Sequence, residues 1–237
     1  MDKILFQIKK RLRAKARPLT SKQLEWARKI VGKDFNPLGV KTAEVWKIVR
    51  VVYKENQKNL DIKQGLKISE QLLKSKYQEE KFAGFGFIYN FRKEFDESIL
   101  DIFKSWLSKY CTTWAFCDSF CINVIGPWLS KNLELITRLE PWAKHNNLWV
   151  KRASLVAVLK NAKYLEPKYL FKRVTPFMMD NDPMLQKAAG WFLKEAAEYH
   201  KEEVIKFLLG WKNKTPRLIL RYAGEKLPEK VRKKFLS

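Results

Sequence analysis

Glycine and proline are scarce in this chain, which has nine of each among its 237 residues. Few turn-forming residues and little strand-like alternation of polar and apolar side chains favour a protein built from helices. No apolar run reaches the roughly 18 residues of a membrane span. The first ten residues also lack the apolar core and cleavage site of a signal peptide. We therefore expect a helical protein that stays in the cytoplasm, at the nucleoid when it is bound to DNA, and inserts in no membrane.

Cysteine and histidine are also rare. The cysteines Cys111, Cys117 and Cys121 are odd in number and form no C-x-x-C pair, which argues against a disulfide framework or a zinc knuckle and favours buried free thiols. The two histidines, His145 and His200, stand far apart in the sequence, so no metal-ligand cluster forms. We see no Ser-His-Asp set and no glycine-rich phosphate loop. The sequence therefore predicts neither a metal nor a cofactor.

Acidic residues are few relative to basic ones. The chain has 48 Lys and Arg against 25 Asp and Glu, with a formal net charge of +23 and a pI near 9.9. An excess of this size attracts polyanions, and nucleic acid is the leading candidate. A basic proteome or a thermophile surface is the alternative, although thermophile surfaces normally balance Lys with Glu. The hydrophobic content of 46% is enough for a continuous core.

A weak repeat runs through most of the chain. Five charged residues recur at steps of 37, 34, 35 and 34 residues, and each is followed by small or apolar side chains. These repeat residues are Lys81, Asp118, Arg152, Lys187 and Arg221. A period near 35 is typical of stacked helical hairpins in an α-solenoid. Equivalent positions of a solenoid line up along one surface, so the repeat predicts a basic groove with a single acid in its middle.

Helical spacing of apolar residues predicts five or six antiparallel helix pairs of HEAT-like type. Asp96, Asp182 and Thr215 have the positions of helix N-caps. The pairs Glu79-Glu80 and Glu202-Glu203 have the pattern of solvated helix starts. The expected helices cover residues 43–54, 61–74, 78–93, 96–109, 113–124, 130–142, 147–162, 167–178, 183–198, 202–210, 215–226 and 228–235.

The first 40 residues differ from the rest. A cationic run from Lys9 to Arg17 precedes Pro18. It is either a helix laid against a phosphate backbone or a solvated amphipathic cap that shields the first repeat, and the sequence leaves both open. Because terminal repeats of solenoids are commonly atypical, we treat residues 1–40 as capping helices of one domain that covers residues 1–237.

One group of side chains has the composition of an active site. Trp114 and Asp118 stand at i and i+4 and so share one helix face. Arg152 follows one repeat later, and Lys187 and Trp191 form another i, i+4 pair. Two Trp, one Asp and one Arg would then converge on the concave wall of the solenoid. The alternative is that the Trp side chains are core and that the Asp and Arg form an ion pair between repeats.

The same motifs resemble a known family. Trp114-x-x-x-Asp118, Leu148-Trp149-Val150-Lys151-Arg152-Ala153, Gln186-Lys187-Ala188-x-Gly190-Trp191 and Leu220-Arg221-Tyr222-Ala223 are similar, in order and spacing, to those of the AlkD-type DNA alkylation-repair glycosylases. Leu38-Gly39-Val40-Lys41-Thr42 resembles that family's G-[IV]-x-T element. The resemblance spans residues 24–226. The chain departs from the family where Thr42-Ala43 replaces the usual Thr-Pro, and near Val45-Trp46, where an Arg is missing.

The resemblance implies an α-solenoid of HEAT-like repeats whose concave basic surface grips duplex DNA. It implies that Asp118 is the essential carboxylate, that Trp114 and Trp191 are the aromatic groove residues, and that Arg152 is the groove arginine. With these four as the catalytic set, the residues that we expect to contact DNA are Lys41, Lys81, Trp149, Lys151, Lys187 and Arg221.

The implied activity is excision of N3- or N7-alkylated purines such as 3-methyladenine and 7-methylguanine. Such a purine already carries positive charge and leaves as a neutral base, so one carboxylate suffices where ordinary glycoside hydrolysis uses two. We therefore predict a monomeric, monofunctional DNA glycosylase of base excision repair, without metal or cofactor and without a closed base pocket. The alternatives are a non-catalytic HEAT-like module that binds damaged or branched DNA, and a scaffold for an acidic protein.

Overall fold

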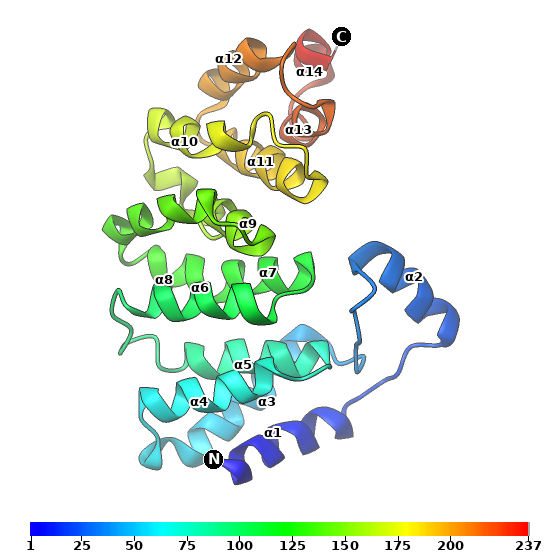
Figure 1. Ribbon diagram of the computed structural model, residues 1–237, viewed down its shortest axis with the longest axis vertical. Coiled ribbons are helices and arrows are strands. Elements are labelled where there is room, and N and C mark those ends of the chain that lie inside the picture. The colour runs from blue at the N-terminus through cyan, green and yellow to red at the C-terminus, as the bar shows by residue number, and fades with distance from the viewer. Residues whose placement is uncertain (237) are drawn as a thin grey trace. The chain divides into compact units, whose positions relative to one another are not determined.

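The computed structural model describes residues 1–236, and every regular element within them is helical. Consecutive helices pair and stack, which confirms the all-α, α-solenoid fold class (Figure 1). The chain divides into two compact units, Met1–Val124 and Ile125–Ser237. Ser237 lies outside the described residues. The single domain 1–237 stays a prediction, and each unit is treated separately below. No helix in the described part of the chain is both long and apolar enough to cross a membrane.

The N-terminal unit contains α1 to α7. Their bounds are α1 Asp2–Ala14, α2 Ser21–Val31, α3 Thr42–Asn56, α4 Ile62–Leu73, α5 Gln78–Tyr89, α6 Ile99–Tyr110 and α7 Trp114–Phe120, with a short 3₁₀ turn, η1 Gln57–Asn59. Helix α5 packs against α3, α4 and α7, and it buries side chains all round because it is the central element. Phe85 stacks on Phe120, the last residue of α7, with ring centroids 4.4 Å apart.

The two N-terminal helices behave differently. Helix α1 buries Ile4, Ile8 and Leu12 against the unit, which agrees with a cap on the first repeat. Helix α2 buries none of its side chains, although Thr20 and Gln23 close a capping box at its start. Figure 1 shows α2 held away from the other helices of its unit by extended segments. The sequence predicted capping helices here but gave no bounds for them.

The cationic run in α1 is partly neutralised inside the unit. Arg11 pairs with Glu55 at 2.8 Å, and Lys9 and Arg13 pair with the buried Glu80 at 3.6 and 3.2 Å. These ion pairs agree with the cap interpretation. Lys10 stays exposed on α1, so the run keeps charge for a polyanion as well.

The C-terminal unit begins at Ile125, the last residue of a π-helical turn, and holds the elements that follow this turn. A π-helical turn, η2 Cys121–Ile125, joins α7 to α8 Gly126–Leu129, and η3 Leu133–Lys144, α9 Leu148–Val156, η4 Leu159–Tyr164, α10 Pro167–Val174, η5 Thr175–Phe177, α11 Pro183–Ala196, α12 Lys201–Trp211, α13 Arg217–Ala223 and α14 Glu229–Leu236 follow. Helix α11 is the centre of this unit and packs against α9, α10 and α13. The helix expected over residues 130–142 is a 3₁₀ helix over 133–144, where Pro141 removes one backbone donor. The helices expected over 147–162 and 167–178 each begin as an α-helix and are followed by a 3₁₀ segment.

Two of the three expected N-caps are wrong. Asp182 caps α11 as predicted, because its carboxylate accepts from the backbone N–H groups of Met184 and Leu185. Asp96 instead accepts from Ser98, the N-cap of α6, so the helix starts two residues later than its carboxylate suggested. Thr215 donates its hydroxyl hydrogen to the carbonyl of Met178 and does not cap α13.

Gly190 allows close approach of α11 and α13, which yields a stability prediction. A Cβ at this position would lie 2.4 Å from Tyr222 Cβ and 2.8 Å from the carbonyl oxygen of Ile219. We expect Gly190→Ala to lower the free energy of unfolding by about 2 kcal/mol or more, because the two helices must separate. Urea denaturation measures this.

Gly210 supplies the matched control, since nothing lies within 4 Å of the corresponding Cβ. Gly210→Ala should leave stability unchanged or raise it by up to about 1 kcal/mol, because alanine has the higher helix propensity. Equal losses in the two variants would contradict close packing at Gly190.

Candidate functional site

The five repeat residues lie on alternate helices, as the period required. Lys81 is on α5, Asp118 on α7, Arg152 on α9, Lys187 on α11 and Arg221 on α13. Their exposure differs: Asp118 and Arg152 are 7% and 4% exposed, Lys81 and Lys187 are half-buried, and Arg221 is exposed. The middle of the repeat is therefore a pair of buried charges, whereas its ends offer cations to solvent.

Trp114 and Asp118 share a face of α7, as their spacing predicted. Thr113 caps the helix by accepting from the backbone N–H of Phe116, which places Trp114 at the first helical position and Asp118 one turn later. The half-buried indole of Trp114 donates from Nε1 to the carbonyl oxygen of Ile30 at 3.1 Å. This bond fixes the indole beside the C-terminal end of α2, a contact that the sequence did not indicate.

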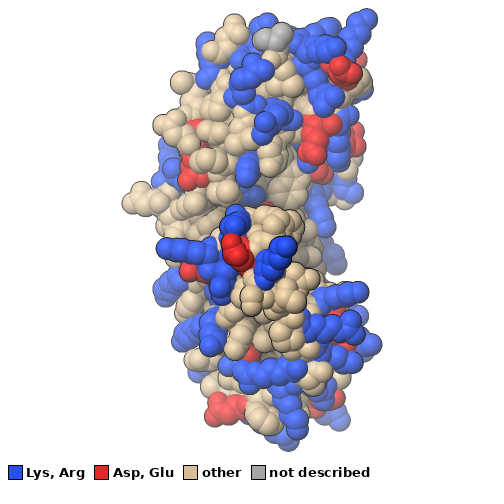
Figure 2. Space-filling model, turned by 90° about the vertical axis from the view of Figure 1, so that its right-hand side faces the viewer, with Lys and Arg blue, Asp and Glu red and all other residues tan. Residues whose placement is uncertain are grey.

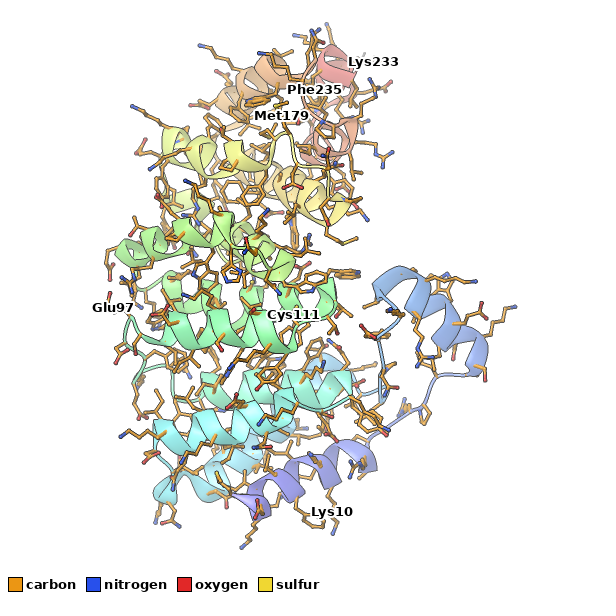
Figure 3. All side chains as sticks on the ribbon, in the orientation of Figure 1. Lys10, Glu97, Cys111, Met179, Lys233 and Phe235 are labelled. Carbon is orange, nitrogen blue, oxygen red and sulfur yellow. The ribbon has the colours of Figure 1, made fainter. Side chains whose placement is uncertain are left out.

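The three thiols gather beside the Asp118 carboxylate. All are buried and free, as predicted, and Cys111, labelled in Figure 3, directly follows α6. Burial raises the pKa of Cys111 and of Cys121 well above that of an ordinary thiol, and a hydrogen bond to Cys117 and the charge of Asp118 raise it further. Thiols of this kind stay protonated at neutral pH and are poor nucleophiles.

Lys81 lies on the same part of the N-terminal unit. Its ammonium is 5.6 Å from the centre of the Phe116 ring and donates to the carbonyl oxygen of Tyr110 at 3.4 Å. Burial lowers its pKa, and interactions with the acidic groups of Cys111 and Asp34 oppose the shift. Lys81, Trp114 and Asp118 are thus brought together around the start of α7.

The loop before α3 is fixed by a buried carboxylate. Glu79 accepts from the backbone N–H groups of Leu38, Gly39 and Val40 at 2.7, 2.8 and 3.1 Å. Gly39 has a φ of 81°, and a Cβ there would lie 1.9 Å from the carbonyl oxygen of Arg17, so only glycine fits. Lys41 follows as the exposed N-cap of α3.

This arrangement corrects an expectation. Glu79 and Glu80 were expected to be solvated, yet they are 5% and 1% exposed. Sequence reasoning therefore missed Glu79, which orients Lys41. The only signal was the neighbouring glycine element, whose backbone N–H groups require an acceptor. Glu202 and Glu203, which have the same pattern at the start of α12, are exposed as expected.

In the C-terminal unit, Arg152 points toward the start of α11. Its Nη1 donates to the carbonyl oxygen of Met184, in the first turn of that helix. The Arg152 side chain is buried, whereas Lys151, the residue before it on α9, is half-buried and partly open to solvent. Trp149 is a half-buried residue in the first turn of α9, and its backbone N–H donates to the side chain of the N-cap Asn147 at 3.0 Å. Arg152 therefore links α9 to the start of α11.

Trp191 lies one turn after Lys187 on α11, as expected from the i, i+4 spacing. Its Nε1 donates to a carboxylate oxygen of Glu195 at 3.2 Å. Both Trp191 and Lys187 are half-buried, and Arg221 is exposed on the neighbouring α13. Trp114 and Asp118 belong to the N-terminal unit and Arg152 and Trp191 to the C-terminal one, so the convergence of all four stays a prediction.

The surface is rich in positive charge. Figure 2 shows a face on which Lys and Arg side chains are spread widely and Asp and Glu side chains are few. Within residues 1–236, no group of three or more His, Cys, Asp and Glu side chains has a geometry that could hold a metal ion. The site thus consists of a carboxylate, indoles and dispersed cations.

Comparison with known proteins gives two findings. Residues 8–227 match the family described as DNA alkylation repair enzyme. A solved structure described as a predicted DNA alkylation repair enzyme from Enterococcus faecalis superimposes with a TM-score of 0.77 at 17% sequence identity. The superposition covers 91% of this chain and 98% of that one. At such identity the superposition supports the fold alone. No curated protein sequence matches the chain.

Proposed function

The chain belongs to the family of DNA alkylation repair enzymes, and we propose that it is a monofunctional glycosylase that releases N3- and N7-alkylated purines from duplex DNA. The observation that carries this proposal is the pairing on α7 of a buried carboxylate, Asp118, with the indole of Trp114 one turn before it. The net charge of +23 supplies the affinity for a polyanion.

The reaction needs little from the protein. The bond between C1′ of the sugar and N9 of the purine breaks, and its electron pair neutralises the positive charge on the alkylated base. No acid is needed, because the base leaves uncharged. Water then adds to C1′ and loses a proton, leaving an abasic site. The protein's task is to stabilise the sugar cation and to guide the water.

In this proposal Asp118 opposes the cationic sugar and accepts the proton of the attacking water. Trp114 and Trp191 offer electron-rich faces to the same cation, worth about 0.5–2 kcal/mol each. Arg152 is the groove arginine of this catalytic set. Lys41, Lys81, Trp149, Lys151, Lys187 and Arg221 hold the backbone of the duplex. Such contacts position the protein without reading sequence, so sequence preference should be weak.

The direct test is release of bases from duplex DNA treated with a methylating agent, in buffer with a metal chelator. Chromatography should detect 3-methyladenine or 7-methylguanine in the soluble fraction, and the DNA should gain abasic sites but no strand breaks. Borohydride should trap no covalent complex, because a monofunctional enzyme forms no Schiff base. No release with intact DNA binding would overturn the proposal.

That negative outcome would favour a non-catalytic module that binds damaged or branched DNA. One observation speaks for this second function: Asp118 is only 7% exposed and lies beside buried thiols. A purely structural carboxylate would occupy such a place. The two functions differ in base release and share affinity for DNA.

Salt dependence tests the duplex contacts separately. Five cations of the proposed set, Lys41, Lys81, Lys151, Lys187 and Arg221, would release counterions on binding. Each neutralised phosphate adds about 0.9 to the steepness with which log affinity falls against log salt. Affinity should therefore fall a few hundredfold between about 50 and 200 mM salt. Fluorescence anisotropy with an undamaged duplex measures it.

Single substitutions refine this test. Lys187→Gln should reduce the slope of log affinity against log salt by about one. Lys58→Gln, at an exposed lysine of the turn after α3, should leave the slope unchanged. An affinity that does not change with salt would exclude backbone capture.

A further inference from the structure

The N-terminal unit contains a cavity with the chemistry of a nucleotide site. The cavity has a volume of about 450 Å³ and lies between α3 and the C-terminal end of α5. Four of its lining side chains are cations, Arg50, Lys54, Arg92 and Lys93, and none is acidic. Tyr89, beside these cations, lies eight residues after Lys81, so it is about 12 Å further along α5 than the proposed duplex contact.

The floor of the cavity is aromatic and held in place. Tyr53 packs edge-on against Phe91 with ring centroids 5.2 Å apart, and Trp46 packs edge-on against Tyr89 at 6.1 Å. A Cβ on Gly86, between these rings, would lie 3.3 Å from the Trp46 ring, so the glycine lets the indole lie close to α5. The rings of Trp46, Tyr53 and Tyr89 are half-buried, which leaves part of each accessible, whereas Phe91 is buried behind them.

The cations at the rim are available for a ligand. No ion pair within 4.0 Å involves Arg50, Lys54 or Lys93 in the described part of the chain. Glu55, which follows Lys54 in the sequence, is held by Arg11 at 2.8 Å. Arg92 lies 4.9 Å above the Tyr89 ring and donates to the Tyr89 carbonyl oxygen, so it is oriented by the aromatic floor.

We propose that this cavity binds an unpaired nucleotide of a single-stranded nucleic acid, with the base on the aromatic floor and the phosphates on the four cations. Aromatic platforms flanked by backbone-binding cations are how proteins hold single strands without reading sequence. Arg50 and Lys54 stand one turn apart on α3, so they can contact successive phosphates. A free nucleotide offers the same base and phosphate, and the competition experiment below distinguishes it from a strand.

The experiment measures binding of a fluorescent thymidine decamer to the full chain by anisotropy, at low salt and with excess undamaged duplex to occupy other DNA contacts. The double variant Arg50→Gln/Lys54→Gln should weaken decamer binding by about tenfold or more. Tyr53→Leu should weaken it by a similar factor through lost stacking. Circular dichroism and a thermal melt establish that each variant is folded.

The matched control removes an equally spaced pair of exposed lysines from the neighbouring helix α4. Lys63→Gln/Lys67→Gln removes the same charge from the same unit and should change affinity by less than about twofold. Equal losses in the two double variants would overturn the proposal, because they would mean general electrostatic attraction.

Competitors identify the ligand. The unlabelled decamer should displace the probe at far lower concentration than an abasic decamer with the same phosphates, and thymidine monophosphate should compete weakly. Equal competition by the abasic strand would overturn base stacking, and equal competition by the mononucleotide would overturn strand binding. All variants here should keep the wild-type rate of base release, so loss of strand binding and failure of the proposed glycosylase activity are read separately.

Discussion

Asp118→Asn is expected to reduce release of methylated purines by on the order of 10²–10³-fold while duplex affinity stays within about threefold of wild type. The substitution keeps the shape of the side chain and removes its charge. Because the carboxylate is proposed to oppose a sugar cation, its charge matters in the transition state and little in the bound ground state. Removal of one preorganised electrostatic contact costs enzymes about this factor.

The measurement is a single-turnover rate of base release with enzyme in excess over methylated duplex, so that weaker binding does not mask the chemical step. Asp101→Asn is the control, because Asp101 is exposed on α6 in the same unit and pairs with Lys104 at 2.8 Å. It should release bases at the wild-type rate. An Asp118→Asn protein that is folded and equally fast would make Asp118 structural.

Stability must be measured beside the rate. The Asp118 carboxylate is buried among three thiols, and its charge raises the pKa of Cys111 and Cys121. Neutralising it removes that repulsive effect on the thiolates, so Cys111 and Cys121 should become slightly easier to ionise. A loss of base release without a loss of melting temperature separates the chemical role from the packing role.

The fold could be predicted because helix pairs of nearly constant length follow one another along the chain. Lys81, Asp118, Arg152, Lys187 and Arg221 fall on alternate helices, as a period near 35 requires. Their exposure could not be predicted, since burial depends on which helices pack beside each residue. Asp118 and Arg152 are buried whereas Arg221 is exposed, although all occupy equivalent repeat positions.

The residue that caps a helix could likewise not be predicted from spacing alone. Asp182 and Asp96 both precede apolar helical segments, but only Asp182 accepts from the first turn of its helix. Asp96 accepts from Ser98, which leaves the cap position to the serine. A short polar side chain has several backbone donors within reach, so spacing alone does not choose among them. The indole bond from Trp114 to Ile30 was equally out of reach, because it joins residues 84 positions apart.

Two glutamate pairs show most clearly what the sequence leaves open. Glu79-Glu80 and Glu202-Glu203 both occupy the first turn of a helix, yet the first pair is buried and the second is exposed. The difference lies in distant partners: the loop before α3 offers three backbone N–H groups to Glu79, and α1 offers cations to Glu80. The helix dipole favours an acid at both places and so cannot distinguish them.

Glu79→Gln should therefore lower the free energy of unfolding by about 2–4 kcal/mol. The carboxylate accepts three charge-assisted hydrogen bonds from Leu38, Gly39 and Val40. An amide offers one oxygen in place of two and turns its own N–H₂ toward N–H donors, so at least one buried donor loses its acceptor. Urea denaturation measures the loss, and Glu202→Gln, at the matching exposed position, should change stability by less than about 0.5 kcal/mol.

The same variant tests how Lys41 is positioned. Because Glu79 fixes the backbone immediately before Lys41, the freed loop should weaken duplex binding by about the factor that Lys41→Gln produces alone. Adding Lys41→Gln to Glu79→Gln should then cost no further affinity, since one contact cannot be lost twice. Additive losses would mean that Lys41 reaches the duplex without help from Glu79, and that the carboxylate supports only the fold.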